Sequence, residues 1–318
     1  MPESNVAPLG HPRLSIIVPL YNARATVAAT IQSLQAIETG WEGVNELIVC
    51  DDCSTDGSLE VVRESGFDRC RLVLLRHEVN QGEAGCYQTM LEQMSPTSDW
   101  FIILHADDLA LPNFLMRNQS ILSECCTGIA SVSSNYYSFN ENTRYLASPE
   151  EDLIVWGAGM PEGAIDTART GSWWHISGAL VNRKAWEQIG GRSPALPHAG
   201  DWEMVLRWQC AGWLLGHSLV PTTQYRQEAG SVSSNAYLSF QDLREQCLVV
   251  AAMPGLFSGH LRTVVVARII RSATRRMVKF AASGNWGRSG KGLGIIKMGG
   301  RLMFRCSEES ASSVQRRS

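Results

Sequence analysis

Residues 14–22 read Leu-Ser-Ile-Ile-Val-Pro-Leu-Tyr-Asn, an apolar run of strand length that ends in polar side chains. Pro19 has no N–H to donate to a sheet, so the run predicts a short strand that ends there. Asn22 is a residue type that caps helices, and residues 27–34 carry apolar side chains at helical spacing. The stretch therefore predicts a strand followed by a helix that Asn22 caps.

The same alternation continues along the first half of the chain. Further apolar runs of strand length occupy residues 47–49, 72–75 and 101–104, and helical segments are predicted between them and after Pro112. Strands that are apolar throughout, rather than at alternate positions, are typical of a parallel sheet covered on both faces. We therefore predict an α/β fold with a mostly parallel sheet flanked by helices.

The composition is that of a globular protein with an uneven charge. Of 318 residues, 44% are hydrophobic and 19% are charged, which excludes a disordered chain. The formal net charge of −3 argues against a protein that binds nucleic acid over its whole surface. Residues 255–318, however, contain 13 Lys and Arg against 2 Asp and Glu, a net charge of +11. An acidic body is thus followed by a basic segment.

Cysteine spacing and hydropathy indicate the cellular compartment in which the protein is expected. Among the nine cysteines only Cys50 and Cys53 have the spacing of metal ligands, and no second pair completes a zinc site. The first twelve residues lack the apolar run of a secretory signal, and no stretch reaches the ~18 apolar residues of a membrane span. These features predict free thiols and a cytoplasmic protein.

Polar side chains follow each of the first four predicted strands. They are Tyr21 and Asn22, Asp51 to Ser58, Arg76 with Asn80 to Gly82, and His105 to Asp108. The carboxyl ends of parallel strands meet at one edge of a sheet, where such folds bind their ligands. Each cluster alone could be an ordinary turn or the start of a helix. Their joint placement favours a site in which carboxylates accept from a base N–H or a ribose hydroxyl and an aromatic ring stacks.

Asp107 adds a second kind of chemistry to this edge. Its carboxylate offers the hard oxygen ligands that Mg²⁺ and Mn²⁺ prefer, and these ions bind through one or two carboxylates together with substrate phosphates. Such a metal stabilises the negative charge that develops on a departing diphosphate. The residues therefore favour a site for a nucleoside diphosphate and a divalent metal.

These segments together resemble the family 2 glycosyltransferases of the GT-A fold. The resemblance is carried by residues 15–22, 51–58, 80–82 and 106–108, which match in order and spacing. It implies a Rossmann-like GT-A fold and an enzyme that transfers a sugar from a nucleoside diphosphate sugar, with UDP-sugars favoured. The acceptor would be a glycan or a lipid-linked glycan, in surface polysaccharide synthesis.

The resemblance also assigns roles to residues of the donor half. Pro19, Tyr21 and Asp52 would contact the nucleobase and ribose, Arg76 would lie near the donor, and Asp107 would hold Mn²⁺ or Mg²⁺. The expected donor-binding residues are Pro19, Tyr21, Asn22, Asp51, Asp52, Arg76, Gly82, His105, Ala106 and Asp107. Further candidates for metal ligands are Asp108, His105 and Glu228.

In the second half the resemblance places a catalytic base at Asp201, with Glu203 in reserve. A carboxylate there takes the proton of the acceptor hydroxyl as this attacks the anomeric carbon from the face opposite the diphosphate, so the anomeric configuration inverts. Asp201 could instead only cap a helix. Trp173 and Trp174 are candidates for a sugar-stacking surface on the acceptor side, or for core residues.

Two departures from the family pattern keep a second function open. His105 stands where the family's Asp-x-Asp metal motif usually has its first Asp, and Gly200 stands where an acidic partner of Asp201 is usual. A neutral imidazole still ligates Mn²⁺ or bonds to a ribose hydroxyl. The alternative is a catalytically silent module that binds a nucleotide sugar or a glycan.

The expected organisation is a glycosyltransferase domain over residues 1–235, with a donor half over 12–135 and an acceptor half over 136–235. A helical, basic extension follows over 236–318. Within it, residues 262–280 mix apolar and basic side chains in the pattern of a basic amphipathic helix. Such a helix either packs on the acidic body or contacts an anionic membrane, which would make the protein peripheral at the inner face of the plasma membrane.

Overall fold

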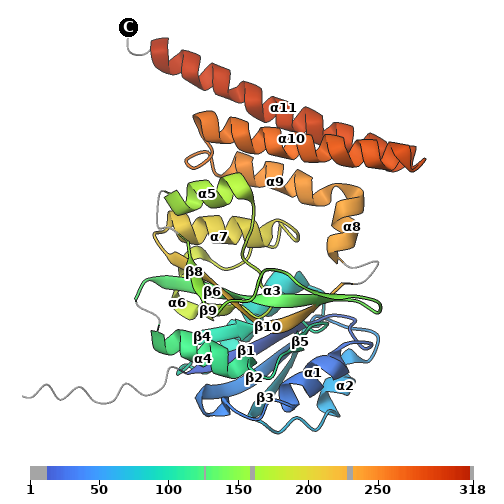
Figure 1. Ribbon diagram of the computed structural model, residues 1–318, viewed down its shortest axis with the longest axis vertical. Helices are drawn as coiled ribbons and strands as arrows, with labels where there is room; N and C mark the ends of the chain where they lie inside the picture. Colours follow the sequence, from blue (N-terminus) through green and yellow to red (C-terminus); the bar gives the residue numbers. More distant parts are fainter. Residues whose placement is uncertain (1–12, 125–126, 158–161, 228–231, 316–318) are drawn as a thin grey trace, which may run out of the picture. The chain divides into compact units, whose positions relative to one another are not determined.

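The computed structural model describes residues 13–124, 127–157, 162–227 and 232–315 (Figure 1). They divide into two compact units that are not contiguous in sequence. Unit 1 comprises residues 1–159, 174–194 and 211–227, and unit 2 comprises residues 160–173, 195–210 and 228–318. The division into a domain over 1–235 and an extension over 236–318 stays a prediction.

Unit 1 is built on one ten-stranded sheet, whose first strands are parallel. The sheet order is β3-β2-β1-β4-β9-β6-β10-β5, with β7 beside β6 and β8 beside β10. In register, Leu20 lies opposite Asp51, and Asp51 opposite Arg76, which sets these strand ends level at one edge. The strands are β1 (Leu14–Leu20), β2 (Val44–Asp51), β3 (Arg71–Arg76), β4 (Trp100–Ile103), β5 (Leu109–Ala110), β6 (Ile129–Phe139), β7 (Arg144–Leu146), β8 (Ile154–Trp156), β9 (Leu180–Asn182) and β10 (Leu214–Arg226).

The predicted parallel order of the first four strands is confirmed, and the second half of the sheet is mixed. β9 runs antiparallel to both β4 and β6, whereas β6 and β10 are parallel to each other. β9 spans only Leu180–Asn182. β9 thereby joins the parallel strands of the donor half to the later strands of the same sheet.

Helices cover both faces of this sheet, as the uninterrupted apolar strands require. Leu14, Ile16 and Val18 of β1 are buried in one core with residues 27–34 of the first helix, and α3 packs against β1 and β2. The helices of unit 1 are α1 (Val27–Gln35), α2 (Ser58–Arg63), α3 (Gly82–Gln93), α4 (Phe114–Glu124) and α6 (Arg183–Ile189), with a short 3-10 helix at Trp41–Gly43.

Unit 2 is helical and has its own apolar core. Its helices are α5 (Glu162–Thr170), α7 (Gly200–Cys210), α8 (Val232–Ser239), α9 (Gln241–Ala252), α10 (Gly259–Ala282) and α11 (Trp286–Gln315). Val265, Val266 and Ile269 of α10 are fully buried in that core, so the apolar face of the predicted amphipathic helix packs within unit 2. Within the described ranges, no helix is both long and apolar enough to cross a bilayer.

Candidate functional site

The carboxyl ends of β1 and β2 are tied together by side-chain hydrogen bonds. Asn22 Oδ1 accepts from the N–H of Thr55 at 3.0 Å, and the N–H of Asn22 donates to Ser54 Oγ at 2.9 Å. The prediction that Asn22 caps α1 is wrong, because that helix begins at Val27 and Asn22 adopts a left-handed conformation with φ +47°. Asn22 instead holds the turn that leaves the ring of Tyr21 54% exposed at this edge.

Asp51 and Arg76 form the next part of the edge. Asp51 is fully buried at the end of β2, and its Oδ2 lies 3.4 Å from Arg76 Nε. Arg76 also donates through Nη2 to the carbonyl of Ser54 at 3.0 Å. The structure thus brings Asp51, Arg76 and the turn after β2 together, with the outer part of the Arg76 side chain exposed. Pro19, opposite Cys50 in the sheet, lies one residue before the same edge.

Asp52 holds the loop that begins α3. Its Oδ1 accepts from the N–H of Gln81 and its Oδ2 from the N–H of Gly82, both at 2.8 Å, and Oδ1 lies 2.8 Å from His77 Nδ1. Gly82 has φ +74°, a conformation that glycine adopts without strain. Asp52 is almost wholly buried, so a contact with the nucleobase, which stays a prediction, has only the remaining lone pair of Oδ2 to use.

His105 pairs with a carboxylate from another element. Its Nε2 lies 2.9 Å from Glu83 Oε1 on α3 and 3.2 Å from the Tyr87 hydroxyl, while Glu83 Oε2 lies 2.7 Å from Arg192 Nη1. Burial disfavours the charged form of both partners, but Arg192 and His105 lower the pKa of Glu83 to about 2. The hydrogen bond and charge of Glu83 likewise raise the pKa of His105 to about 9. With Nε2 engaged, a ligand bond from His105 would use Nδ1.

Asp107 and Asp108 complete a cluster that fits a divalent cation. One ligand atom each from His105, Asp107 and Asp108 lie within 4.8 Å of one another. Asp108 is fully buried, its Oδ1 accepts from the N–H of Arg226 at 2.9 Å, and its Oδ2 accepts no hydrogen bond from the described residues. Burial and the neighbouring Asp107 raise the pKa of Asp108 to about 6. A buried carboxylate oxygen without a donor, beside a second carboxylate, suits Mg²⁺ or Mn²⁺.

Two backbone contacts fix the turn that carries this cluster. The carbonyl of Ala106 accepts from the hydroxyls of Thr26 and Thr30, each at 3.0 Å, so α1 holds one side of the turn. Arg226, at the end of β10, donates through Nε to the carbonyl of Asp107 at 2.9 Å. The guanidinium therefore lies beside the candidate metal ligands, where it can meet phosphate oxygens.

The candidate bases lie on the first turn of α7 in unit 2. Glu203 is fully engaged, since its two oxygens lie 2.6 and 2.7 Å from Nε and Nη2 of Arg207. The N-terminus of α7 is held by Glu245 of α9, a fully buried carboxylate that accepts from the N–H groups of His198 and Ala199 at 2.8 Å. This arrangement fixes the turn that carries Asp201, and the choice of Asp201 over Glu203 as catalytic base stays a prediction.

The remaining predicted residues differ in their surroundings. Trp174 is buried in unit 1 and donates from Nε1 to Ser131 Oγ at 2.9 Å, so the stacking prediction rests on Trp173. Trp173 belongs to unit 2, is half-buried, and donates to Thr167 Oγ1 at 3.1 Å. Glu228 lies outside the described residues.

Sequence reasoning missed several residues that shape the site. His77, Glu83 and Arg192 each hold one of the predicted residues, or its partner, in place. Glu83 directly follows the Asn-Gln-Gly segment, so its position at the start of a helix beside the strand ends was a usable signal. Nothing in the local sequence of Arg192 points to this site, because its pairing with Glu83 depends on the tertiary fold.

Residues 15–189 match the family model described as "Glycosyl transferase family 2". An Escherichia coli protein, the UDP-Glc:alpha-D-GlcNAc-diphosphoundecaprenol beta-1,3-glucosyltransferase WfgD, is 34% identical over 131 residues, which cover 41% of this chain and 48% of that protein. The chain thus spans about half the length of this curated relative in the match.

Solved structures agree at the level of the fold. The S. aureus TarS 1-349 structure in complex with UDP-GlcNAc gives a TM-score of 0.58 at 14% identity, over 87% of this chain and 89% of that chain. The mannosyltransferase PcManGT from Pyrobaculum calidifontis, in complex with GDP-Man and Mn²⁺, gives a TM-score of 0.57 at 15% identity, over 93% and 86% of the two chains.

Proposed function

Because the chain belongs to glycosyl transferase family 2, whose model matches more than half of it, we propose that it transfers a sugar from a UDP-sugar to a lipid-linked glycan during surface polysaccharide synthesis. The family and the GT-A type of α/β fold, both predicted from the sequence, are confirmed. The observation that carries the proposal is the grouping of His105, Asp107 and Asp108 at the strand ends, with one buried Asp108 oxygen left without a donor.

The choice of donor and acceptor follows what similar proteins use. The name of WfgD gives a UDP-glucose donor and an acceptor in which N-acetylglucosamine is linked through a diphosphate to a lipid. The TarS structure holds UDP-GlcNAc. We therefore place UDP-sugars first among donors, and an acceptor glycan on a diphosphate lipid first among acceptors.

The metal would be Mn²⁺ or Mg²⁺, held by Asp107, Asp108 and the remaining nitrogen of His105. When bound, it neutralises charge on the departing diphosphate. A metal ligates only neutral imidazole, so binding at Nδ1 would release the proton of that nitrogen, while Nε2–H would stay hydrogen-bonded to Glu83. Arg226, fixed on the carbonyl of Asp107, would add a charge-assisted hydrogen bond to a phosphate oxygen.

Asp201 would serve as the catalytic base of a single displacement that inverts the anomeric configuration. Its carboxylate would take the proton of the acceptor hydroxyl during attack. Support comes from the fixed start of α7, which Glu245 holds through two backbone N–H groups. A base needs such a fixed position, because proton transfer requires hydrogen-bond reach to the acceptor.

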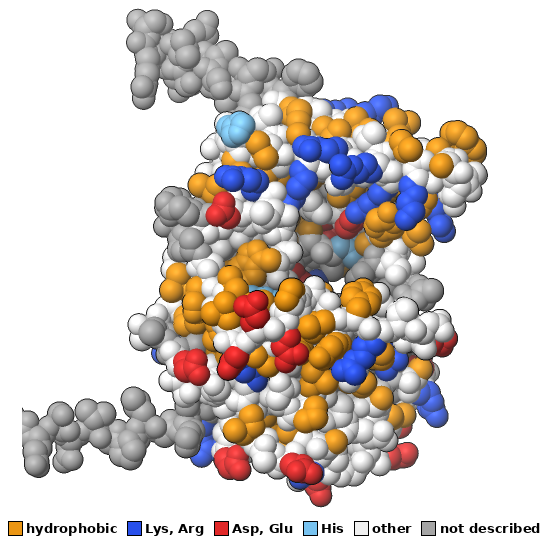
Figure 2. Space-filling view, viewed as in Figure 1, with side chains coloured by type: hydrophobic (Ala, Val, Ile, Leu, Met, Phe, Trp, Pro, Cys, Tyr) orange, Lys and Arg blue, Asp and Glu red, His pale blue; other side chains and the backbone are white. Residues whose placement is uncertain are grey.

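The outer surface of α10 and α11 suits a peripheral contact with anionic lipid on the cytoplasmic side. Apolar side chains lie exposed among the basic ones: Val278 is 64%, Trp286 71% and Leu293 52% exposed. Figure 2 shows blue and orange side chains interspersed over these helices. Exposed basic residues in this region are Arg271, Arg275, Lys279, Arg288, Lys291, Lys297 and Arg301. Basic and aromatic side chains on one helix surface are typical of membrane-surface helices.

A donor panel tests the proposed function. Each common nucleoside diphosphate sugar is incubated with the full chain and Mn²⁺, and thermal stabilisation and released nucleoside diphosphate are measured. One UDP-sugar should stabilise the protein and be hydrolysed slowly. Stabilisation without release, even with acceptor lipid present, would instead favour the silent binding module. No response to any donor would overturn the proposal.

A further inference from the structure

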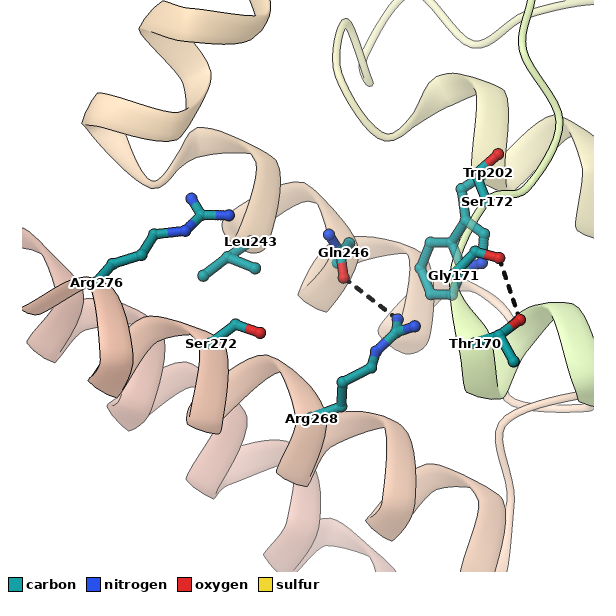
Figure 3. A pocket seen from close by; sticks show the side chains of 9 residues that line it. All are labelled: Thr170, Gly171, Ser172, Trp202, Leu243, Gln246, Arg268, Ser272 and Arg276. Atoms are coloured by element: carbon teal, nitrogen blue, oxygen red, sulfur yellow. Dashed lines mark hydrogen bonds between the residues drawn. The ribbon is translucent and has the colours of Figure 1, made fainter. Parts of the chain in front are cut away.

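Unit 2 contains a cavity of about 250 Å³ that no part of the proposed reaction uses so far (Figure 3). Its walls come from the end of α5, the start of α7, and the facing sides of α9 and α10. The lining residues are Thr170, Gly171, Ser172, Trp202, Leu243, Gln246, Arg268, Ser272 and Arg276. Two of them are arginines, and none is an acid.

Arg268 brings an unbalanced positive charge into this cavity. Its guanidinium donates to the carbonyl of Arg169 at 3.1 Å and to Gln246 Oε1 at 3.4 Å, and it lies 5.5 Å from the ring centre of Trp202. All three partners are neutral groups, and no carboxylate in the described part of the chain pairs with Arg268. Burial lowers the pKa of Arg268, which reflects the cost of a charge held away from water.

Arg276 carries the second guanidinium of the cavity, and this one is paired with a carboxylate. Both of its terminal nitrogens bond to the Asp242 carboxylate, at 2.8 and 2.5 Å, so its charge is balanced within the protein. Because a charge held partly away from water gains stability from a counter-ion, the contrast between Arg276 and Arg268 favours an anion from outside the chain as the partner of Arg268.

The other groups of the cavity suit an oxyanion. The hydroxyl of Ser272 lines the cavity on the same helix as the arginines, and a hydroxyl donates readily to a phosphate oxygen. Gly171 keeps the space beside the guanidinium clear, because it has φ +102° and a Cβ there would stand 3.0 Å from Arg268 Nη1. A phosphate group can accept two parallel N–H bonds from such a guanidinium.

We propose that this cavity binds the phosphate groups of the diphosphate-linked acceptor lipid, an inference that rests on the proposed function. Trp202, which forms one wall, directly follows Asp201 in α7. A site that grips the acceptor's diphosphate there fixes the acceptor relative to the turn that carries the proposed base. An anionic lipid headgroup presents the same phosphate chemistry, so the test must separate the two sources.

The experiment measures binding of farnesyl diphosphate, a short prenyl diphosphate, to the full chain by titration calorimetry. Arg268→Gln should weaken this binding at least about 10-fold, the usual scale for a lost charge-assisted hydrogen bond. Arg271→Gln is the matched control, because Arg271 lies one turn away on α10, is exposed and does not line the cavity. It should leave the dissociation constant within about twofold. Arg268→Lys keeps the charge but loses the paired N–H donors of the guanidinium, so it should give an intermediate dissociation constant.

Several results would overturn the inference. Equal weakening by Arg268→Gln and Arg271→Gln would mean diffuse attraction rather than a site. Loss of binding to phosphatidylglycerol vesicles with unchanged farnesyl diphosphate binding would assign Arg268 to a membrane headgroup instead. Melting temperature and donor hydrolysis, both expected to survive in Arg268→Gln, exclude unfolding. If the wild-type chain hydrolysed no donor yet bound farnesyl diphosphate through Arg268, the proposed function would fail while the anion site stood.

Discussion

Glu83 Oε1 lies 2.9 Å from His105 Nε2, and the two residues come from different elements that the fold brings together at the strand ends. His105 occupies a position where the family usually has an aspartate. Glu83, on α3, is held by Arg192 as well as by His105. The cluster whose ligand atoms lie close enough for a metal ion consists of His105, Asp107 and Asp108, and Glu83 holds the His105 ring through Nε2.

The Glu83–His105 pair predicts a specific dependence of stability on pH. The pKa of Glu83 is lowered to about 2 from 4.5, so its contribution is present above pH 4.5 and is lost as pH falls toward 2. The pKa of His105 is raised to about 9 from 6.5, so its contribution is present below pH 6.5 and is lost as pH rises through 9. The pair therefore stabilises the folded state most between pH 4.5 and pH 6.5.

Glu83→Gln should therefore lower the free energy of unfolding by about 3 kcal/mol between pH 4.5 and 6.5, since it leaves Arg192 and His105 without their carboxylate. Urea denaturation of both proteins across the pH range measures the difference, which should narrow toward pH 2 and pH 9. A difference that does not change with pH would show that the pair contributes no linked protons.

Asp107→Asn tests the metal assignment. Removing a carboxylate from the cluster should weaken Mn²⁺ binding in the presence of UDP. Donor turnover should fall at least about 100-fold, because a bound metal stabilises the developing negative charge of the transition state by several kcal/mol. Calorimetry with Mn²⁺ and UDP gives a readout independent of turnover. Glu78→Gln, which changes an exposed carboxylate after β3, is the control and should change neither. Unchanged Mn²⁺ affinity in Asp107→Asn would remove Asp107 from the metal site.

Asp201→Asn and Glu203→Gln separate the two candidate bases. Asp201→Asn should lower kcat by about 10²–10⁴-fold, the usual contribution of a general base, with little change in UDP affinity. Glu203→Gln breaks the largely buried ion pair with Arg207, so it should cost about 1–3 kcal/mol of stability and leave kcat nearly unchanged. Steady-state kinetics with acceptor present measures both, and the reverse outcome would assign the base to Glu203.

Asp52→Asn tests whether Asp52 positions the loop or contacts the donor. The amide NH₂ cannot accept from the N–H of Gly82 or Gln81, so one backbone donor loses its partner and the free energy of unfolding should fall by about 2 kcal/mol. The KM for the donor should rise with it. Thermal denaturation and donor kinetics give the two values. A raised KM with unchanged stability would mean that Asp52 acts mainly on the nucleotide.

The donor edge was predictable because its physical causes are local. Each apolar run forms a strand and each polar cluster follows it directly, so the parallel register of β1, β2 and β3 brings residues 22, 51 and 76 together without further information. The conformation of the turn at Asn22 was harder to predict, because its left-handed backbone depends on hydrogen bonds to Ser54 and Thr55, more than thirty residues away.

The residues that hold the predicted site residues in place could not be predicted either, because their contacts join positions that are still farther apart in the sequence. Arg192 reaches Glu83, and Glu245 reaches the start of α7, only through tertiary packing, and no periodicity or spacing encodes either contact. The two units are also interleaved along the chain, with residues 160–173 and 195–210 grouped with the C-terminal helices. Composition along the chain carries no signal for such interleaving.

The proposed transfer from a UDP-sugar to a lipid-linked glycan can be measured with a labelled sugar and a synthetic N-acetylglucosaminyl diphosphate lipid as acceptor. The wild-type chain is incubated with the UDP-sugar selected by the donor panel, with Mn²⁺ or with chelator, and the product is analysed by mass spectrometry and proton NMR. We expect one added sugar with inverted anomeric configuration, formed only when metal is present. A chain that binds the donor and the acceptor lipid with Mn²⁺ yet forms no product would contradict it.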